Sequence, residues 1–118
     1  MKTHKDLVVW KSAIKLAGNV YRITEKYPKN ETFGIVSQMK RSAVSIGANI
    51  AEGAARQTKK EFIQYLYIAL GSSSELDTLI EISRETNLIE NNKLNEMQNS
   101  LSVISKMLNG LIHSLKSK

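Results

Sequence analysis

Apolar residues recur at alternating steps of three and four along most of the chain, which is the spacing of one face of an α-helix. The longest such stripe lies near the C-terminus and contains Leu94, Met97, Leu101, Ile104, Leu108, Leu111 and Leu115. Met107 and Ile112 widen it, as a bundle core or a second interface requires. We therefore predict a helix from Asn91 or Asn92, acting as N-cap, to near the end of the chain.

A second helix is predicted from about Asp6 to Lys26. Its apolar stripe is Leu7, Trp10, Ile14, Ala17, Tyr21 and Thr24. The helix should end at Tyr27-Pro28, because the residue before a proline is pushed out of the α region.

Two more helices are predicted in the middle of the chain. One runs from Glu31 or Thr32 to Ala55, with the stripe Val36, Met39, Ala43, Ile46 and Ile50. The other follows a capping box in which the Thr58 hydroxyl and Glu61 satisfy the first turn, and it ends near Thr86. Its stripe is Phe62, Leu66, Ala69, Ser73, Leu76 and Ile80. Asn87 suits a left-handed C-terminal position.

These four segments indicate an all-α fold, an antiparallel up-down four-helix bundle that occupies residues 1–118 as a single domain. Short connections make sequential helices antiparallel neighbours. A single proline and only six glycines also favour long helices over a turn-rich β architecture. A long coiled coil is the alternative fold, and the interruptions of the helical pattern near residues 28, 57 and 87–92 argue against it.

The composition of the chain argues against most kinds of catalytic site. The chain has no cysteine, so disulfides, Cys-zinc sites and thiol catalysis are excluded, and a cytoplasmic location is expected. Its two histidines, His4 and His113, lack a Glu three residues earlier, which disfavours a di-metal bundle site. Neither a phosphate-binding loop nor a serine nucleophile motif occurs. We expect no enzyme activity, metal, cofactor or small-molecule substrate, and no apolar run approaches the ~18 residues of a membrane span.

The net charge of +6 is unevenly distributed. Residues 1–30 hold seven Lys or Arg and two acids, whereas residues 62–92 hold one and five. Such a chain could self-associate through regions of opposite charge, or it could bind a polyanion through its basic face. The candidate nucleic-acid-binding residues form one stripe of the first helix: Lys11, Lys15, Arg22 and Lys26. A solubilising surface is the alternative interpretation. No aromatic residue interleaves these positions, so contacts to phosphates are expected and base stacking is not.

A polar stripe on the second helix opposes its apolar stripe and contains Gln38, Arg41, Ser45, Asn49, Glu52 and Arg56. The neighbouring residues are small, as if another helix packs closely. We favour a structural polar network or subunit interface formed by Arg41, Asn49, Glu52, Arg56 and, from the third helix, Glu75. A solvated face and a ligand site are the other two interpretations. Covered charges need partners, and Glu52 is the natural partner of Arg56.

The stretch from Gln38 to Arg56, QMKRSAVSIGANIAEGAAR, resembles the signature of the four-helix-bundle proteins encoded in 23S rRNA intervening sequences. Further matches are Asp6-Leu7 with Trp10, Tyr27-Pro28, Glu31-x-Phe33-Gly34, and the third-helix residues Phe62, Leu66, Ala69-x-Gly71-Ser72 and Glu75-Leu76. Ala54-Ala55 and Asp77 depart from the usual pattern. The resemblance covers nearly the whole chain.

The resemblance implies a four-helix bundle that assembles as a homopentameric ring or barrel. The related accessory proteins of diversity-generating retroelements are similar pentamers that bind nucleic acid and a reverse transcriptase. The first functional hypothesis is therefore an oligomeric adaptor associated with RNA or DNA. The second is a homo-oligomeric protein–protein scaffold without a nucleic-acid role, and an enzyme is third.

Overall fold

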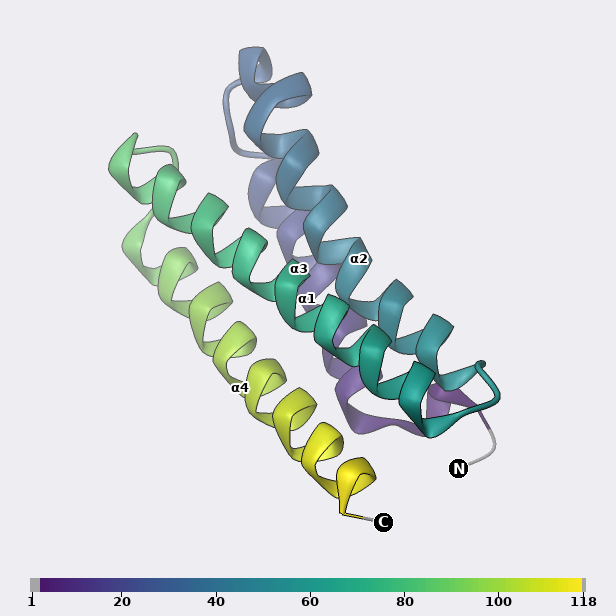
Figure 1. The fold of residues 1–118 in the computed structure, drawn as a ribbon. Coiled ribbons are helices and arrows are strands. Elements are labelled where there is room, and N and C mark those ends of the chain that lie inside the picture. The colour runs from purple at the N-terminus through teal and green to yellow at the C-terminus, as the bar shows by residue number, and fades with distance from the viewer. Residues whose placement is uncertain (1–2, 118) are drawn as a thin grey trace.

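Four long α-helices account for most of residues 3–117, the part of the chain that the structure, a computed structural model, describes. They are α1 (Val8–Thr24), α2 (Ser37–Ala54), α3 (Lys59–Glu85) and α4 (Asn91–Lys116). They run up, down, up and down, so that both ends of the chain lie at the same end of the bundle (Figure 1). Each helix packs against its neighbours in sequence, and α4 closes the bundle against α1. The predicted all-α, four-helix-bundle fold is confirmed.

The helix ends follow local capping chemistry. A short 3-10 turn, His4–Asp6, precedes α1, and the Thr3 hydroxyl caps it by accepting from the Lys5 N–H at 3.1 Å. The first helix thus begins two residues later than predicted. At the start of α3 the Thr58 hydroxyl accepts from the Glu61 N–H at 3.1 Å, as the capping box predicts. Asn87 adopts φ 59°, the left-handed conformation expected after α3.

Two more helix starts differ from the prediction. The connection after α1 contains a 3-10 turn, Lys29–Glu31, and a π-helical turn, Thr32–Val36, so α2 begins only at Ser37. Gly34 interrupts this connection with φ −106° and ψ −114°. The N-cap of α4 is Glu90, one residue before the predicted asparagines.

The predicted apolar stripes of α2, α3 and the first four turns of α4 all face the core. Met39, Ile46, Ile50, Leu66, Leu76, Ile80, Met97 and Leu108 have no exposed side-chain surface. Near its C-terminus the buried position of α4 moves to Ile112, whereas Leu111 and Leu115 are half-buried. Burying such side chains contributes about 1.5–3 kcal/mol each relative to exposure, and this term dominates the stability of the bundle.

The apolar stripe predicted for α1 is fully buried only at Thr24, whereas Leu7, Trp10 and Ala17 are half-buried. The structure buries a parallel stripe instead: Val9, Ala13, Leu16, Val20, Ile23 and Tyr27. Of the predicted stripe, Ile14 and Tyr21 are 47% and 44% exposed. Both stripes have helical spacing because α1 is apolar over a broad arc, and only the neighbouring helices select one. The predicted stripe lies along the outer seam with α2, where Lys40 Nζ sits 4.6 Å from the centre of the Tyr21 ring.

The closest approach in the bundle is between α2 and α3, whose contact is the most extensive of any helix pair. A Cβ atom placed on Gly53 would lie 2.7 Å from Tyr65 Cβ and 3.2 Å from the Phe62 carbonyl oxygen. Glycine is therefore the only residue that fits between the two helices at this point without moving them. The small residues noted in the sequence of α2 thus serve close helix packing, as expected.

Candidate nucleic-acid interface

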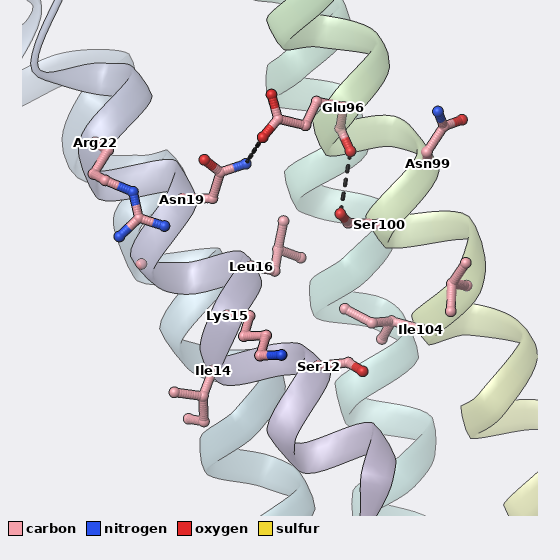
Figure 2. A pocket seen from close by; sticks show the side chains of 12 residues that line it. Ser12, Ile14, Lys15, Leu16, Asn19, Arg22, Glu96, Asn99, Ser100 and Ile104 are labelled. Atoms are coloured by element: carbon pink, nitrogen blue, oxygen red, sulfur yellow. Dashed lines mark hydrogen bonds between the residues drawn. The ribbon is translucent and has the colours of Figure 1, made fainter.

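The four predicted basic residues are all exposed. Lys15 and Arg22 lie on the side of α1 that faces α4, and Lys26 follows the end of α1 at Thr24. An open groove of about 670 Å³ separates the two helices there. Lys15 and Arg22 line its α1 wall together with Ser12 and Asn19 (Figure 2). Lys11 lies one turn before Lys15 and outside the groove, and Lys26 lies one turn beyond Arg22.

Core packing fixes the α1 wall of the groove. Leu16, which is 2% exposed, anchors the middle of the helix to the core and forms the groove floor with Ile104. Gly18 leaves room for the Arg22 side chain, whose Nη1 lies 3.4 Å from the position that a Gly18 Cβ would take. Arg22 therefore folds back along α1 toward Gly18.

The α4 wall supplies polar groups that sequence reasoning missed. Asn99 and Ser100 line it, and Glu96 projects into the upper part of the groove (Figure 2). Asn19 Nδ2 donates to Glu96 Oε1 at 3.1 Å, and Lys93 Nζ lies 3.7 Å from Glu96 Oε2. In the sequence these groups appear only as polar residues at helical spacing, Glu96, Asn99 and Ser100, and the packing of α4 against α1 is needed to place them in a groove.

Glu96 sets the electrostatics of the groove. Its carboxylate is the only acidic group among the residues that line this space, where both lining cations, Lys15 and Arg22, come from α1. It lowers the positive potential locally and orients Asn19 by accepting its amide proton. The groove can hold an anion at its lower part, near Lys15, more favourably than beside Glu96.

A smaller pocket of about 350 Å³ continues the groove at the end of the bundle where α1 ends and α4 begins. Its floor is apolar and consists of Ile23, Tyr27, Leu88 and Ile89. Its rim carries three cations, Arg22, Lys26 and Lys93, and one acid, Glu90. The Tyr27 hydroxyl is buried and has no hydrogen-bond partner among the described residues, and this burial raises the pKa of Tyr27 above its ordinary value of 10.0, an effect that the nearby Ser83 side chain partly offsets.

The polar stripe of α2 divides into two clusters. In one, Ser45 Oγ lies 2.9 Å from Ser72 Oγ of α3, and Asn49 Nδ2 donates to the Ser45 carbonyl at 2.8 Å. In the other, Arg56 Nη2 lies 3.0 Å from Glu52 Oε2 and donates to the Tyr65 hydroxyl at 2.6 Å. The predicted pairing of Glu52 with Arg56 is therefore present in the structure.

Arg41 and Glu75 do not join either cluster. Both are exposed, and within residues 3–117 neither forms an ion pair or a hydrogen bond. The expectation that Glu75 closes the network within one chain is not met, and the assignment of Arg41 and Glu75 to a subunit contact stays a prediction.

Arg56→Ala should lower the free energy of unfolding by about 1 kcal/mol. It removes an exposed ion pair, which contributes roughly 0.2–1 kcal/mol, and a cation–π contact at 4.9 Å to the Tyr65 ring, worth about 0.5–1 kcal/mol at an exposed site. Arg41→Ala is the matched control and should change the melting temperature little. Thermal unfolding of both variants tests this, and an equal loss in Arg41→Ala would contradict the contacts described above.

The described residues contain little else that could support chemistry. No three His, Cys, Asp or Glu side chains within residues 3–117 cluster as metal ligands. Over the same range, no helix is long and apolar enough to cross a membrane.

Comparison with known proteins identifies relatives of the whole bundle. The family model described as 23S rRNA-intervening sequence protein matches residues 5–110. A crystal structure of a protein with unknown function from the S23 ribosomal protein family of Bacteroides thetaiotaomicron superposes with a TM-score of 0.84 at 28% identity, covering 90% of this chain and 96% of that one. No curated protein sequence is significantly similar to the chain. Because the family model spans all four helices, the chain belongs to the 23S rRNA-intervening sequence protein family.

Proposed function

We propose that this protein is a non-enzymatic, cytoplasmic oligomer that binds nucleic acid through the basic side of α1. The observation that supports the proposal is the groove between α1 and α4, which Lys15 and Arg22 line and which the exposed residues Lys11 and Lys26 extend at either end. The family's description ties its members to 23S rRNA intervening sequences, which makes RNA the first ligand to test.

The groove suits phosphates better than bases. No aromatic side chain lines it, and its neutral polar residues, Ser12, Asn19, Asn99 and Ser100, can bond to phosphate and sugar oxygens. Lys11 to Lys26 spans fifteen residues of helix, or about 22 Å, which is the length of about six or seven nucleotides of one strand in a duplex. We therefore expect structured RNA or DNA to bind with little sequence preference.

Binding to a structured RNA at increasing salt tests this function. The logarithm of the binding constant should fall linearly with the logarithm of salt concentration, with a slope of about −0.9 for each phosphate contacted. Fluorescence anisotropy with a labelled stem-loop would measure it. Undetectable binding at low salt, with folded protein, would overturn the proposal.

Assembly is the second part of the proposal. Repetition of the basic side of α1 around an oligomer would combine weak contacts through avidity. The resemblance implies five subunits. Light scattering at micromolar concentration measures the mass directly, and a monomer mass would contradict this part while leaving nucleic-acid binding measurable.

A protein–protein scaffold is the second candidate, and exposed apolar side chains favour it. Ile14 and Tyr21 of α1 and Val44 of α2 are 44–47% exposed. Such a surface is suited to a protein partner. If the oligomer forms but binds no nucleic acid at any salt concentration, the scaffold interpretation is the better one.

A further inference from the structure

Phe33 is the most exposed large apolar side chain of the described residues. It is 97% exposed, whereas the others in this class range from 44% to 66%. It lies in the π-helical turn Thr32–Val36 of the connection between α1 and α2, which projects beyond the α3–α4 connection at the same end of the bundle (Figure 1). Leaving a phenyl ring in water forgoes the favourable free energy of burying it, so this position suits an intermolecular anchor.

The pocket with the apolar floor lies at the same end of the bundle. Its floor residues come from the end of α1 and from the α3–α4 connection, and with about 350 Å³ it has room for an aromatic side chain. The chain's own Phe33 does not fill it, because that side chain is almost fully exposed. Each chain therefore presents both an aromatic knob and an apolar pocket without a partner.

Charge makes the two features complementary. The pocket rim carries Arg22, Lys26 and Lys93 against the single acid Glu90. Glu31 lies two residues before Phe33 and is adjacent to the same turn, with Oε1 3.7 Å from the position of a Gly34 Cβ. A knob entering the pocket would bring this carboxylate toward three cations.

We propose that Phe33 of one copy of this chain inserts into the pocket formed by Ile23, Tyr27, Leu88 and Ile89 of a second copy, with Glu31 facing the basic rim. Phe33 and the pocket lie at the same end of the bundle. When two copies pack side by side in the same orientation, Phe33 of one copy is therefore at the same height along the bundle as the pocket of the other. The contact joins two different surfaces. Each added subunit leaves one knob and one pocket open until a ring closes. This inference rests on the self-association in the proposed function.

The contact would divide the basic stripe of α1 into two parts. Arg22 and Lys26 belong to the pocket rim and face the neighbouring subunit, whereas Lys11 and Lys15 stay free for a polyanion. Arg22→Glu with Lys26→Glu should therefore reduce the oligomer mass. Lys11→Glu with Lys15→Glu should leave that mass unchanged.

Engineered disulfides test the contact directly, because the natural chain has no cysteine. Under mild oxidation, mixing the full-length single variants Phe33→Cys and Ile89→Cys should give a covalent dimer containing one of each. The double variant should give a ladder of larger covalent multimers, which an isologous contact could not produce. The matched control mixes Phe33→Cys with Ser114→Cys, an exposed site at the opposite end of the bundle, and should not cross-link.

Two results would overturn the inference. One is cross-linking with Ser114→Cys as efficient as that with Ile89→Cys. The other is an unchanged oligomer mass in Phe33→Ala, measured by light scattering with helical content checked by circular dichroism. If that variant keeps its mass but loses affinity for a looped RNA, Phe33 is a base-stacking residue instead. If both of these results are obtained with a protein that still forms an oligomer and binds RNA, the oligomer assembles through another surface. The proposed function is then unaffected.

Discussion

Replacing Lys11 and Lys15 together by Glu is expected to weaken RNA binding by roughly tenfold or more at low salt while the bundle stays folded. Both side chains are exposed, and neither forms an ion pair or hydrogen bond with a described residue, so folding does not depend on them. The reversal replaces two phosphate-facing cations with two repelling anions. The salt slope should become shallower by about two for each subunit that contacts RNA.

Two further sets of variants distinguish binding along the groove from a general effect of the net charge on RNA affinity. Lys60→Glu with Arg84→Glu changes the net charge equally on α3, at positions outside the groove lining, and should cost much less affinity. Glu96→Gln should act in the opposite direction and strengthen binding a few-fold, because it removes the acidic group of the groove and keeps an acceptor for Asn19. Equal losses in the two double variants, or no gain with Glu96→Gln, would contradict binding along the groove.

Gly53→Ala is expected to lower the free energy of unfolding by about 1–3 kcal/mol. The added methyl group would lie 2.7 Å from Tyr65 Cβ and 3.0 Å from Phe62 Cδ1, so α2 and α3 must separate or shift. This cost exceeds the gain of about 1 kcal/mol that alanine usually brings to a helix interior. Denaturant unfolding followed by circular dichroism would measure it.

Two other glycines provide matched controls. A Cβ atom on Gly71 of α3 or Gly110 of α4 would meet nothing within 4 Å. Gly71→Ala and Gly110→Ala should therefore stabilise the bundle by up to about 1 kcal/mol. A loss in these variants comparable to that in Gly53→Ala would show that loss of glycine as such, rather than the contact with α3, is responsible.

The sequence alone determined the number, type and approximate limits of the helices. The apolar stripes of α2, α3 and most of α4 were predicted correctly from the regular three- and four-residue spacing of their apolar residues, although α3 also exposes Tyr67, Ile68 and Ile82 on other faces. Thr58, Asn87 and the Tyr27-Pro28 pair act through their own backbone or the first turn beside them, so their effects could be read locally. The family could be predicted from the stretch between Gln38 and Arg56, and the family model confirms it.

The candidate site was predicted only in part. The basic stripe of α1 was visible as four cations at helical spacing, and its pairing with α4 was not. Asn99 and Glu96 are separated from Lys15 by about eighty residues, and the sequence has no local signal that such groups share a groove. The ion pair of Glu52 with Arg56, which lie one turn apart, was predicted correctly, although both side chains are about half exposed and not covered by another helix. The predicted part of Glu75 was not found, because its place depends on how α3 lies against α2.

Tertiary packing decided what several local patterns left open. α1 carries two apolar stripes one residue apart, and both satisfy helical periodicity. Packing buries the one containing Leu16 and Val20 and leaves Ile14 and Tyr21 on the outer seam. The same packing exposes Phe33 and opens the pocket beside Tyr27. Periodicity determines which residues share a helix face, whereas the direction of that face depends on contacts between segments far apart in the chain, and these exist only in the folded bundle.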